Sequence, residues 1–436
     1  MERYLKSDSS IKNQSFLSIG FSLHYIEFHH FIKKVNRVNT MECNPFEFVK
    51  MPHIIFGPGK LNELYKIMPK YGRNILFVIG DRSLKQSSKW DEIISFVENT
   101  TLNYFQISIT NEPSPIIIDT AAKEFRKKDI ELVVGIGGGS VIDAGKAISA
   151  MIPKNNSIKN YLEGVGHKTH DGQKIPYIAI PTTSGTGSEA TKNAVISEVG
   201  LKGFKKSLRH DNLVPNIAIV DPELIISCPP SISAMCGMDA LTQLIEAYVS
   251  SKRSLITNAL AFSGLKSMYD KLIPVCSVGA SDINIRSAIA YGSLISGISL
   301  ANAGLGIVHG LASSIGGLFN IPHGVICGTL LAEATKMNIK KLRELGSQGK
   351  GALRKYAEVG AIFRVNESAI NSENFKNCAF LAEALEKLTE ELKLDKLGKF
   401  GIKAEDVNRI VAITGIKNNP VALDQNDIKT IVLNRI

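Results

Sequence analysis

Hydrophobic and polar positions follow two alternating periods along the first half of the chain. Short apolar runs with the length of buried strands are each followed by a stretch in which apolar residues recur every three or four positions, as on one face of a helix. Strands separated by helical patterns favour a largely parallel sheet, so this half is predicted to be α/β. The expected strands are 53–56, 74–79, 104–107, 132–136, 176–180 and 217–220, and the expected helices are 61–68, 89–98, 116–127 and a helix that follows the glycines at 137–139.

The pattern changes after the Cys228-Pro-Pro230 segment. Helical spacing follows helical spacing, first over 231–250, 255–272 and 283–299, and no strong strand pattern returns. We therefore predict an all-helical second domain. The expected organisation is an α/β domain over 41–227 and a helical domain over 228–436.

Residues 1–40 match neither pattern. The segment combines a short apolar piece, Phe16–Leu23, with a histidine-rich stretch, and it lacks the clean apolar centre and the small-residue cleavage site of a signal peptide. We expect an extension that is either disordered or the product of a misassigned start, with Met41 as the natural first residue.

Composition places the chain among ordinary globular proteins and argues against several other classes. It has 436 residues, of which 44% are hydrophobic and 21% are charged, so a large core is available. No run of about 18 apolar residues occurs, and no membrane partner is expected. The net charge of +10 is spread along the chain, which favours a solvated basic surface over a nucleic-acid partner.

The six cysteines show neither C-x-x-C spacing nor the density of a disulfide scaffold. A reducing compartment is therefore expected, and we assign the chain to the cytoplasm. The cysteines are expected to be buried or surface thiols rather than metal ligands.

The stretch around Gly137–Gly139 is the first candidate for a binding site. An apolar run ends in three glycines and resumes with helical spacing, which predicts a strand, a tight turn and a helix; Ser140 is expected to cap that helix, with Asp143 at capping-box spacing. Glycines let a phosphate approach the free N–H groups at a helix N-terminus. Glycines that serve packing alone explain the turn as well, because it matches neither the G-x-G-x-x-G fingerprint nor a Walker loop.

Two further stretches of the α/β half carry candidate chemistry. Asp81 follows the expected strand 74–79, where an acidic residue can accept hydrogen bonds from an adenosine ribose and repel a 2′-phosphate; an N-cap role for Asp81 is equally simple. The loop 181–189 is rich in hydroxyls and glycines, which suits phosphate or carboxamide binding, or a plain turn cluster.

The polar segment 155–174 is expected to be a loop with exposed His167 and His170.

The helical half carries two pairs of polar residues at notable spacing. Asp239 and Gln243 lie four residues apart and so share a helix face, although on spacing alone a solvated face is the favoured explanation. His309 and His323 each precede a glycine in apolar surroundings. Buried imidazoles need satisfied nitrogens, so these two are either hydrogen-bonded core histidines or metal ligands joined by groups from another helix.

Taken together, these motifs resemble the iron-containing (group III) alcohol dehydrogenases. The resemblance runs from about Phe48 to the end of the chain and leaves out the first 40 residues. Several specific motifs in the same order make chance similarity improbable. They are 54–61, the Gly137-Gly-Gly-Ser-Val-Ile-Asp143 turn, Pro181-Thr-Thr-Ser-Gly-Thr-Gly-Ser-Glu189, Asp221-Pro222, Gly237-Met-Asp-Ala-Leu-Thr242, Val308-His-Gly310, Pro322-His-Gly324 and Asn419-Pro420.

The resemblance implies a dinucleotide-binding α/β domain, an all-helical domain that holds one divalent metal, and a substrate between them. Carried over residue by residue, it places the pyrophosphate at Gly138, Gly139 and Ser140, and Asp81 at the adenosine ribose unless Gly80 takes that position. The implied cofactors are NAD, with NADP as a possibility, and iron or zinc. The cofactor-binding set is Asp81, Gly138, Gly139, Ser140, Asp143, Thr182, Thr183 and Lys205, in which the threonines face the nicotinamide and Lys205 the ribose region.

This sequence departs from the family at the metal site. The family holds its metal with an aspartate and three histidines, and the matching positions here are Asp239, Gln243, His309 and His323. A glutamine carbonyl can coordinate, but it is neutral and a weaker donor for iron or zinc. A further family histidine, which relays protons, is replaced by Ser313. The metal ligands implied by the resemblance are Asp239, Gln243, His309 and His323, and the reaction is carried by Asp239, His309 and His323.

The function implied is the reversible, NAD(P)-linked and metal-assisted interconversion of a small alcohol and its aldehyde or ketone. Three alternatives stay open: a metal-independent NAD(P)H reductase of the same fold, a lyase that resembles dehydroquinate synthase, and a binding protein that has lost catalysis. The motifs at 181–189 and 237–242 favour the dehydrogenases over the lyase. Members of the family commonly form dimers or larger assemblies, so a homo-oligomer is expected.

Overall fold

The computed structural model describes residues 45–201, 203–364 and 376–436. The described residues from Phe46 to Ile436 belong to one compact unit. The predicted extension at 1–40 and the alternative start at Met41 lie outside the described residues.

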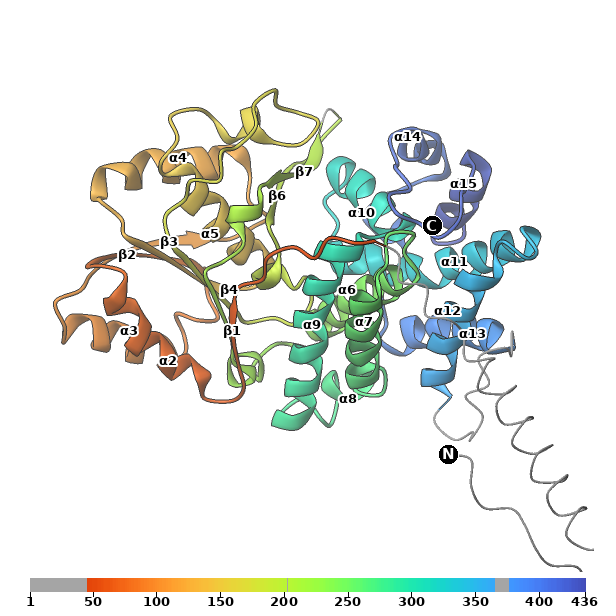
Figure 1. Cartoon of the computed structure of the whole chain (residues 1–436), viewed down its shortest axis with the longest axis horizontal. Coiled ribbons are helices and arrows are strands. Elements are labelled where there is room, and N and C mark those ends of the chain that lie inside the picture. Colours follow the sequence, from red (N-terminus) through yellow and green to blue (C-terminus); the bar gives the residue numbers. More distant parts are fainter. Residues whose placement is uncertain (1–44, 202, 365–375) are drawn as a thin grey trace, which may run out of the picture. The chain divides into compact units, whose positions relative to one another are not determined.

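Six parallel strands form the sheet of the N-terminal half (Figure 1). Their order across the sheet is β1-β8-β5-β4-β2-β3, and each neighbouring pair is parallel. The predicted largely parallel sheet is confirmed. The strands are β1 (His53–Phe56), β2 (Asn74–Gly80), β3 (Asn103–Ile109), β4 (Leu132–Gly137), β5 (Tyr177–Pro181) and β8 (Ile217–Val220).

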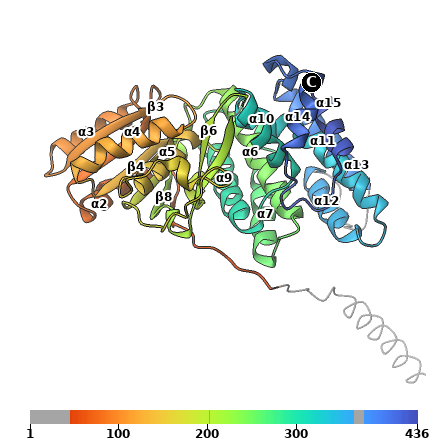
Figure 2. The same cartoon turned by 90° about the horizontal axis from the view of Figure 1, so that it is seen from above.

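Helices cover both faces of this sheet (Figure 2). Successive side chains of a strand point to opposite faces. In β2, Leu76 and Val78 therefore join one core with α4 (Pro115–Phe125) and α5 (Gly139–Met151), whereas Phe77 joins another core with α2 (Glu63–Ile67) and α3 (Ser88–Glu98). Because β2 is buried on both faces, it has the continuous apolar sequence from which it was predicted.

The strand order reverses between β2 and β4. From β2 the chain continues to β3 on one side and then returns to β4 on the other, and Ile79 of β2 pairs with Ile136 of β4. Ligands of open α/β sheets bind outside the carboxyl ends of the strands at such a reversal. Asp81 and Gly138 both follow these carboxyl ends, so the topology brings two predicted cofactor positions to one edge.

An antiparallel pair, β6 (Asn193–Glu198) and β7 (Phe204–Arg209), forms a separate two-stranded sheet that the sequence did not predict. Its apolar residues are few and its outward positions carry lysine and arginine, so the alternating pattern is weak. Ala194, Ile196 and Leu208 nevertheless pack into the core over α5. Tertiary packing therefore decides the structure of this segment.

From Pro230 onward the described residues form helices and turns without a strand, as predicted. The predicted boundary near residue 228 is consistent with this change, and the division into domains stays a prediction. The helices are α6 (Pro230–Val249), α7 (Leu255–Met268), α8 (Leu272–Val275), α9 (Ile283–Ala303), α10 (Ile307–Leu318), α11 (His323–Glu344), α12 (Lys350–Phe363), α13 (Lys376–Glu391), α14 (Val407–Ala412) and α15 (Gln425–Leu433).

Helix α6 packs against α7, α9 and α11 (Figure 1). All residues from Gly237 to Val249 are buried, including Asp239, Gln243 and Glu246. The expectation that the polar face of this helix is solvated is therefore wrong. Polar side chains buried at this depth require partners inside the protein.

Arg286 of α9 fixes the connection between the sheet and the helices. Its guanidinium group, 2% exposed, donates hydrogen bonds to the carbonyl oxygens of Ile226 and Cys228 at 3.2 Å and to the Ser233 hydroxyl at 2.9 Å. Its Nε donates to the Ala280 carbonyl at 2.7 Å. One buried side chain thus holds the backbone that enters α6.

His170 is buried, contrary to the expectation that it is exposed. Its ring lies 3.1 Å from the Ala150 carbonyl oxygen through Nε2, and its Nδ1 accepts a hydrogen bond from the Gly172 amide at 2.9 Å. These contacts hold the 155–174 loop against the end of α5. His167 is exposed, as expected.

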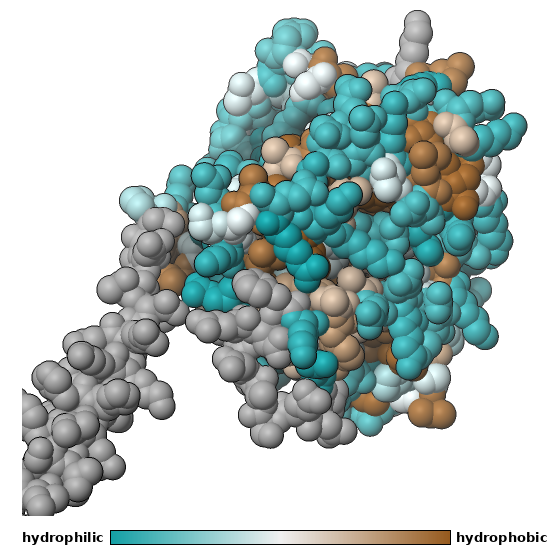
Figure 3. Space-filling view, turned by 90° about the vertical axis from the view of Figure 1, so that its right-hand side faces the viewer, coloured by the Kyte–Doolittle hydropathy of each residue, from teal (hydrophilic) through white to brown (hydrophobic). Residues whose placement is uncertain are grey.

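The surface at the α11–α15 end is mainly hydrophilic, with smaller hydrophobic patches between polar residues (Figure 3). Within the described part of the chain, no single helix has both the length and the apolar composition to cross a bilayer. Helices α9 and α10 pass that test as a pair, but they meet at 98°.

Candidate functional site

Four side chains from three helices converge in the helical half: Asp239, His309, His323 and Cys327. One donor atom of each lies within 4.8 Å of the other three. Nε2 of His309 is 3.3 Å from the Asp239 carboxylate and Nε2 of His323 is 3.8 Å from it. The Cys327 sulfur is 3.7 Å from each of these two nitrogens. We call these four residues the Asp239 cluster.

Local sequence explains how the helices bring these groups together. Asp239 is buried within α6, His309 lies in the first turn of α10, and His323 and Cys327 lie four residues apart on one face of α11. Helix α11 approaches α6 closely at Gly324. A Cβ at this position would collide with the Met235 backbone of α6. The glycine after His323 therefore permits the close approach of the two helices.

Glu246, two turns of α6 beyond Asp239, orients His309. Its carboxylate lies 2.7 Å from His309 Nδ1 and also accepts a hydrogen bond from the Val308 amide at 2.7 Å. A carboxylate at one ring nitrogen holds a proton there, so Nε2 is the nitrogen that can bond a metal once its own proton is released. Burial lowers the pKa of His309, but the facing Cys327, Asp239 and Glu246 groups outweigh this effect and raise it well above the usual value.

The pKa values of Asp239 and His323 are shifted in the directions that favour metal binding. Burial raises the pKa of Asp239, but the neighbouring His323 and His309 outweigh burial and lower it to about 2. Burial lowers the pKa of His323 to about 3, even though Asp239 opposes the shift. At neutral pH the cluster therefore offers an ionised carboxylate and a neutral imidazole, the forms in which these groups bind metals.

The donor set fits a divalent cation. Carboxylate, imidazole and sulfur are the ligand types that zinc and related metals take up, and the carboxylate–histidine contact at Glu246 is the usual support of such ligands. Without a metal, the charge of the buried Asp239 carboxylate, which is 2% exposed, would be balanced by imidazole contacts of 3.3 and 3.8 Å. The structure thus supports the implied metal.

Gln243 points its amide oxygen at α9. Its Oε1 accepts a hydrogen bond from the Ser296 hydroxyl at 2.7 Å, and both side chains are buried. Its role as a ligand stays a prediction.

Ser313 stands in place of the family's relay histidine. Its hydroxyl donates a hydrogen bond to the His309 carbonyl at 2.9 Å, and the Lys417 ammonium lies 3.5 Å from that hydroxyl.

The predicted phosphate turn opens α5, although its cap differs from the prediction. Gly138, and not Ser140, is the N-cap, and within the described structure no side chain caps it. Ser140 is the second helical residue, so its hydroxyl is already inside the first turn. The backbone N–H groups at the start of α5 are therefore left for a ligand rather than for a serine.

A loop connects this turn to the Asp239 cluster. Thr182 follows β5 and its amide donates to the Gly137 carbonyl at 2.9 Å. Thr183 is the nearest neighbour of Gly138, since a Cβ on Gly138 would lie 3.4 Å from its side chain. The same loop packs against α6, because a Cβ on Gly185 would lie 2.8 Å from the side chain of Cys236, which precedes Asp239 by one helical turn. One short segment thus touches both candidate sites.

Asp143 and Lys205 are held by protein partners. The Asp143 carboxylate accepts a hydrogen bond from the Ser188 hydroxyl and another from the Val195 amide at 3.0 Å, which fixes the 181–191 loop to α5. Lys205 of β7 pairs with Glu112. Their roles toward a cofactor, like those of Gly139 and Ser140, stay predictions.

Asp81 lies just beyond β2 at the reversal of the strand order. Its side chain is about half exposed and its nearest ion-pair partner is Arg82 at 3.9 Å, a weak surface contact. Gly80, the other candidate for the ribose position, ends β2, and a Cβ there would meet no atom within 4 Å.

Sequence reasoning missed Cys327 and Glu246. Glu246 lies seven residues after Asp239, two helical turns along the same face, so its spacing carried a signal. Cys327 lies four residues after His323, which is metal-ligand spacing on a helix, but it was grouped with the other cysteines as a thiol without a ligand role.

Comparisons with known proteins agree with this geometry. Residues 52–222 match the family model of iron-containing alcohol dehydrogenases, and residues 233–436 match the model of the C-terminal domain of that family. The chain is 32% identical over 358 residues to long-chain-alcohol dehydrogenase 1 of Geobacillus thermodenitrificans, covering 81% of this chain and 86% of the relative. It is 27% identical to the NAD-dependent methanol dehydrogenase of Bacillus methanolicus, covering 88% and 98%.

Among solved structures, an archaeal halo-thermophilic alcohol dehydrogenase from a Red Sea brine pool shares the fold, with a TM-score of 0.81 at 23% identity, over 90% of this chain and 99% of that one. The two family models together span both halves of the described molecule. The chain therefore belongs to the iron-containing alcohol dehydrogenase family, and it is an NAD-linked, metal-dependent oxidoreductase that interconverts an alcohol with its aldehyde or ketone.

Proposed function

We propose that the reaction takes place at the Asp239 cluster and that Asp239, His309 and His323 hold the divalent metal. The observation that carries this proposal is the convergence of one carboxylate and two imidazoles on a buried point. When bound, a divalent cation supplies Lewis acidity toward an alcohol or carbonyl oxygen. The fourth ligand is either the Gln243 amide oxygen or the Cys327 sulfur.

The protein groups prepare this chemistry. Asp239 contributes a negative charge that stays ionised at neutral pH, and Glu246 keeps the His309 proton on Nδ1. Asp239, His309 and Cys327 are buried among apolar side chains of the core, which strengthens the charge interactions at the cluster. When bound, the nicotinamide would supply the hydride chemistry, and the protein would set its position relative to the substrate.

For the dinucleotide we propose the carboxyl edge of the sheet. Gly138, Gly139 and Ser140 receive the pyrophosphate at the start of α5, where an uncapped helix end attracts anions. Thr182 and Thr183 face the nicotinamide. The loop that carries them contacts both the phosphate turn and α6, and this supports a nicotinamide placed next to the metal. Asp143 acts indirectly by holding that loop, and Lys205 is assigned to the ribose region.

Removing the metal is expected to stop catalysis without unfolding the protein. Protein treated with a chelator should still bind NADH, but it should reduce short aldehydes about a thousandfold more slowly, because Lewis acidity contributes several kcal/mol and each ~1.4 kcal/mol is tenfold in rate. Adding back zinc or iron should restore the rate. Full activity after metal removal would favour the metal-independent reductase, and NADH that is never consumed with any aldehyde would favour a lyase or a binding protein.

Asp81 is expected to favour NADH over NADPH. Its half-exposed carboxylate, beyond β2 at the strand-order reversal, should repel a 2′-phosphate. In Asp81→Gly the preference for NADH should narrow by about fivefold, since an exposed charge interaction is worth about 1 kcal/mol and every ~1.4 kcal/mol is tenfold. Asp81→Asn keeps the shape of the side chain and removes its charge, so it separates the effect of the charge from the effect of the side-chain volume. Equal use of both cofactors by the parent would show that Gly80 occupies the position instead.

We also propose that the chain forms a homo-oligomer in the cytoplasm, without nucleic-acid or membrane partners. The family supports self-association, and sedimentation velocity would test it. The five described cysteines are free thiols, which suits a reducing compartment; localisation of the tagged protein outside the cytoplasm would contradict this.

A further inference from the structure

We propose that the thiolate of Cys327, and not the amide of Gln243, is the fourth metal ligand, and that the Asp239 cluster is consequently a zinc site. This inference rests on the proposed metal at Asp239. It concerns the position at which the chain departs from its family, where a histidine has become Gln243.

The spacing of the donor atoms carries the inference. A tetrahedral zinc ion with bonds of about 2.3 Å to sulfur and about 2.0 Å to nitrogen and oxygen separates nitrogen from sulfur by about 3.5 Å and nitrogen from oxygen by about 3.3 Å. In the Asp239 cluster both nitrogen–sulfur distances are 3.7 Å, and the nitrogen–oxygen distances are 3.3 and 3.8 Å. These four of the six donor separations lie within about 0.5 Å of those that a tetrahedral zinc ion requires, and the other two are within 4.8 Å.

Gln243 is engaged elsewhere. Its Oε1 accepts the Ser296 hydroxyl at 2.7 Å, and Ser296 is itself fixed by a bond to the Ser293 carbonyl at 2.8 Å. Turning Oε1 toward a metal would break its contact with the Ser296 hydroxyl, and a neutral amide would bring no charge to the metal. Cys327 needs no such rearrangement.

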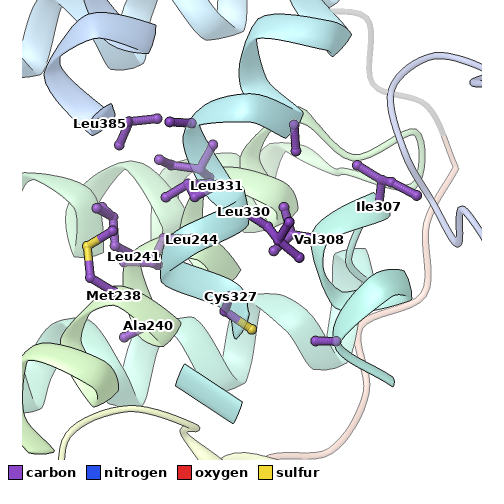
Figure 4. Close-up of a cluster of buried hydrophobic side chains, with 14 of the residues drawn as sticks. Met238, Ala240, Leu241, Leu244, Ile307, Val308, Cys327, Leu330, Leu331 and Leu385 are labelled. Carbon is purple, nitrogen blue, oxygen red and sulfur yellow. The ribbon is translucent and has the colours of Figure 1, made fainter. Parts of the chain in front are cut away.

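Packing alone does not account for Cys327. The residue is fully buried within the hydrophobic core, yet its sulfur points away from Leu241 and Leu244 (Figure 4). It lies instead between the ring nitrogens of two histidines. Cys378 shows the ordinary alternative, since its equally buried thiol donates to the Leu353 carbonyl at 3.4 Å. This contrast makes Cys378 a matched control.

A thiolate changes which metal the site prefers. On binding, the Cys327 S–H bond breaks, its proton passes to solvent, and the sulfur bonds the metal. One carboxylate and one thiolate then balance the charge of a divalent ion. Sulfur is a soft donor, and tetrahedral sites with sulfur and nitrogen ligands select zinc over the harder metals.

Cobalt substitution and zinc X-ray absorption test the inference without any activity assay. The parent loaded with Co(II) should show the near-ultraviolet charge-transfer band of a thiolate ligand, and the zinc-loaded parent should show one sulfur scatterer at about 2.3 Å. Cys327→Ser should lose both signals and weaken zinc binding by at least about a hundredfold, beyond the 10–100-fold typical of changes to supporting residues. Cys378→Ser and Gln243→Leu should keep both signals.

The outcomes separate this inference from the proposed function. If the parent binds zinc with only nitrogen and oxygen scatterers, and Gln243→Leu loses the metal, then Gln243 is the ligand and the proposed function stands. If the parent binds neither zinc nor cobalt, the proposed metal site itself fails. Should Cys327→Ser and Cys327→Ala both misfold, as judged by circular dichroism, the absorption spectrum of the parent decides alone.

Discussion

Asp239→Asn is expected to abolish tight metal binding and to lower kcat/KM for aldehyde reduction by about a thousandfold. The variant keeps the shape of the side chain and removes the carboxylate that lies 3.3 and 3.8 Å from the two imidazoles. Losing one of four ligands should cost a few kcal/mol out of the ~10–16 kcal/mol apparent binding energy of a full four-ligand zinc site. Metal content after dialysis and steady-state kinetics measure the two effects.

Thr242→Val provides the control on the same buried helix. The Thr242 hydroxyl bonds the Met238 carbonyl within α6, so its removal should leave metal content and kcat/KM close to those of the parent. If Asp239→Asn retains full metal and full activity, Asp239 is not a ligand, and the reaction has to be sought away from the cluster.

Gly138→Ala is expected to raise the Kd for NADH by about 10- to 100-fold while the protein stays folded. Gly138 has an extended backbone that alanine can adopt, and the added carbon would lie 3.4 Å from Thr183, an ordinary contact. It would, however, cover the uncapped start of α5. Hydrogen bonds to a charged phosphate contribute about 1.5–3 kcal/mol, and ~1.4 kcal/mol is tenfold in Kd.

Gly351→Ala in α12 is the matched control, because a Cβ there meets no atom within 4 Å. It should leave NADH affinity unchanged and stabilise the helix by about 0.5–1 kcal/mol. Fluorescence titration with NADH measures the affinities, and thermal unfolding confirms the fold. Unaltered NADH affinity in Gly138→Ala would place the pyrophosphate away from α5.

The parts of the fold that could be predicted are those in which local pattern and tertiary packing agree. β2 and β4 are buried on both faces and their apolar runs are continuous, so strand and parallel sheet follow from the sequence. The phosphate turn follows from its three glycines. The pairing of β6 with β7 could not be predicted, because charged residues interrupt the alternation and the contact with α5 decides the structure.

The candidate site was predicted in part for similar reasons. The resemblance to a family supplied Asp239, His309 and His323, which the fold brings together. From spacing alone, the polar face of α6 was predicted to be exposed to solvent. A sequence does not show that α7, α9 and α11 pack around that helix. Cys327 comes from a neighbouring turn of α11, and its meeting with Asp239 depends on the close approach at Gly324.

Arg286 limits how the two halves of the protein can move. Hinges between domains are short segments that absorb large changes in φ and ψ. The backbone at Ile226 and Cys228, where a hinge between the sheet and the helices would be expected, is held by a buried guanidinium that also binds Ser233 and Ala280. A domain motion that releases product would therefore bend the chain at other connections between the two halves. The segment that enters α6 would move together with α9 as one rigid unit.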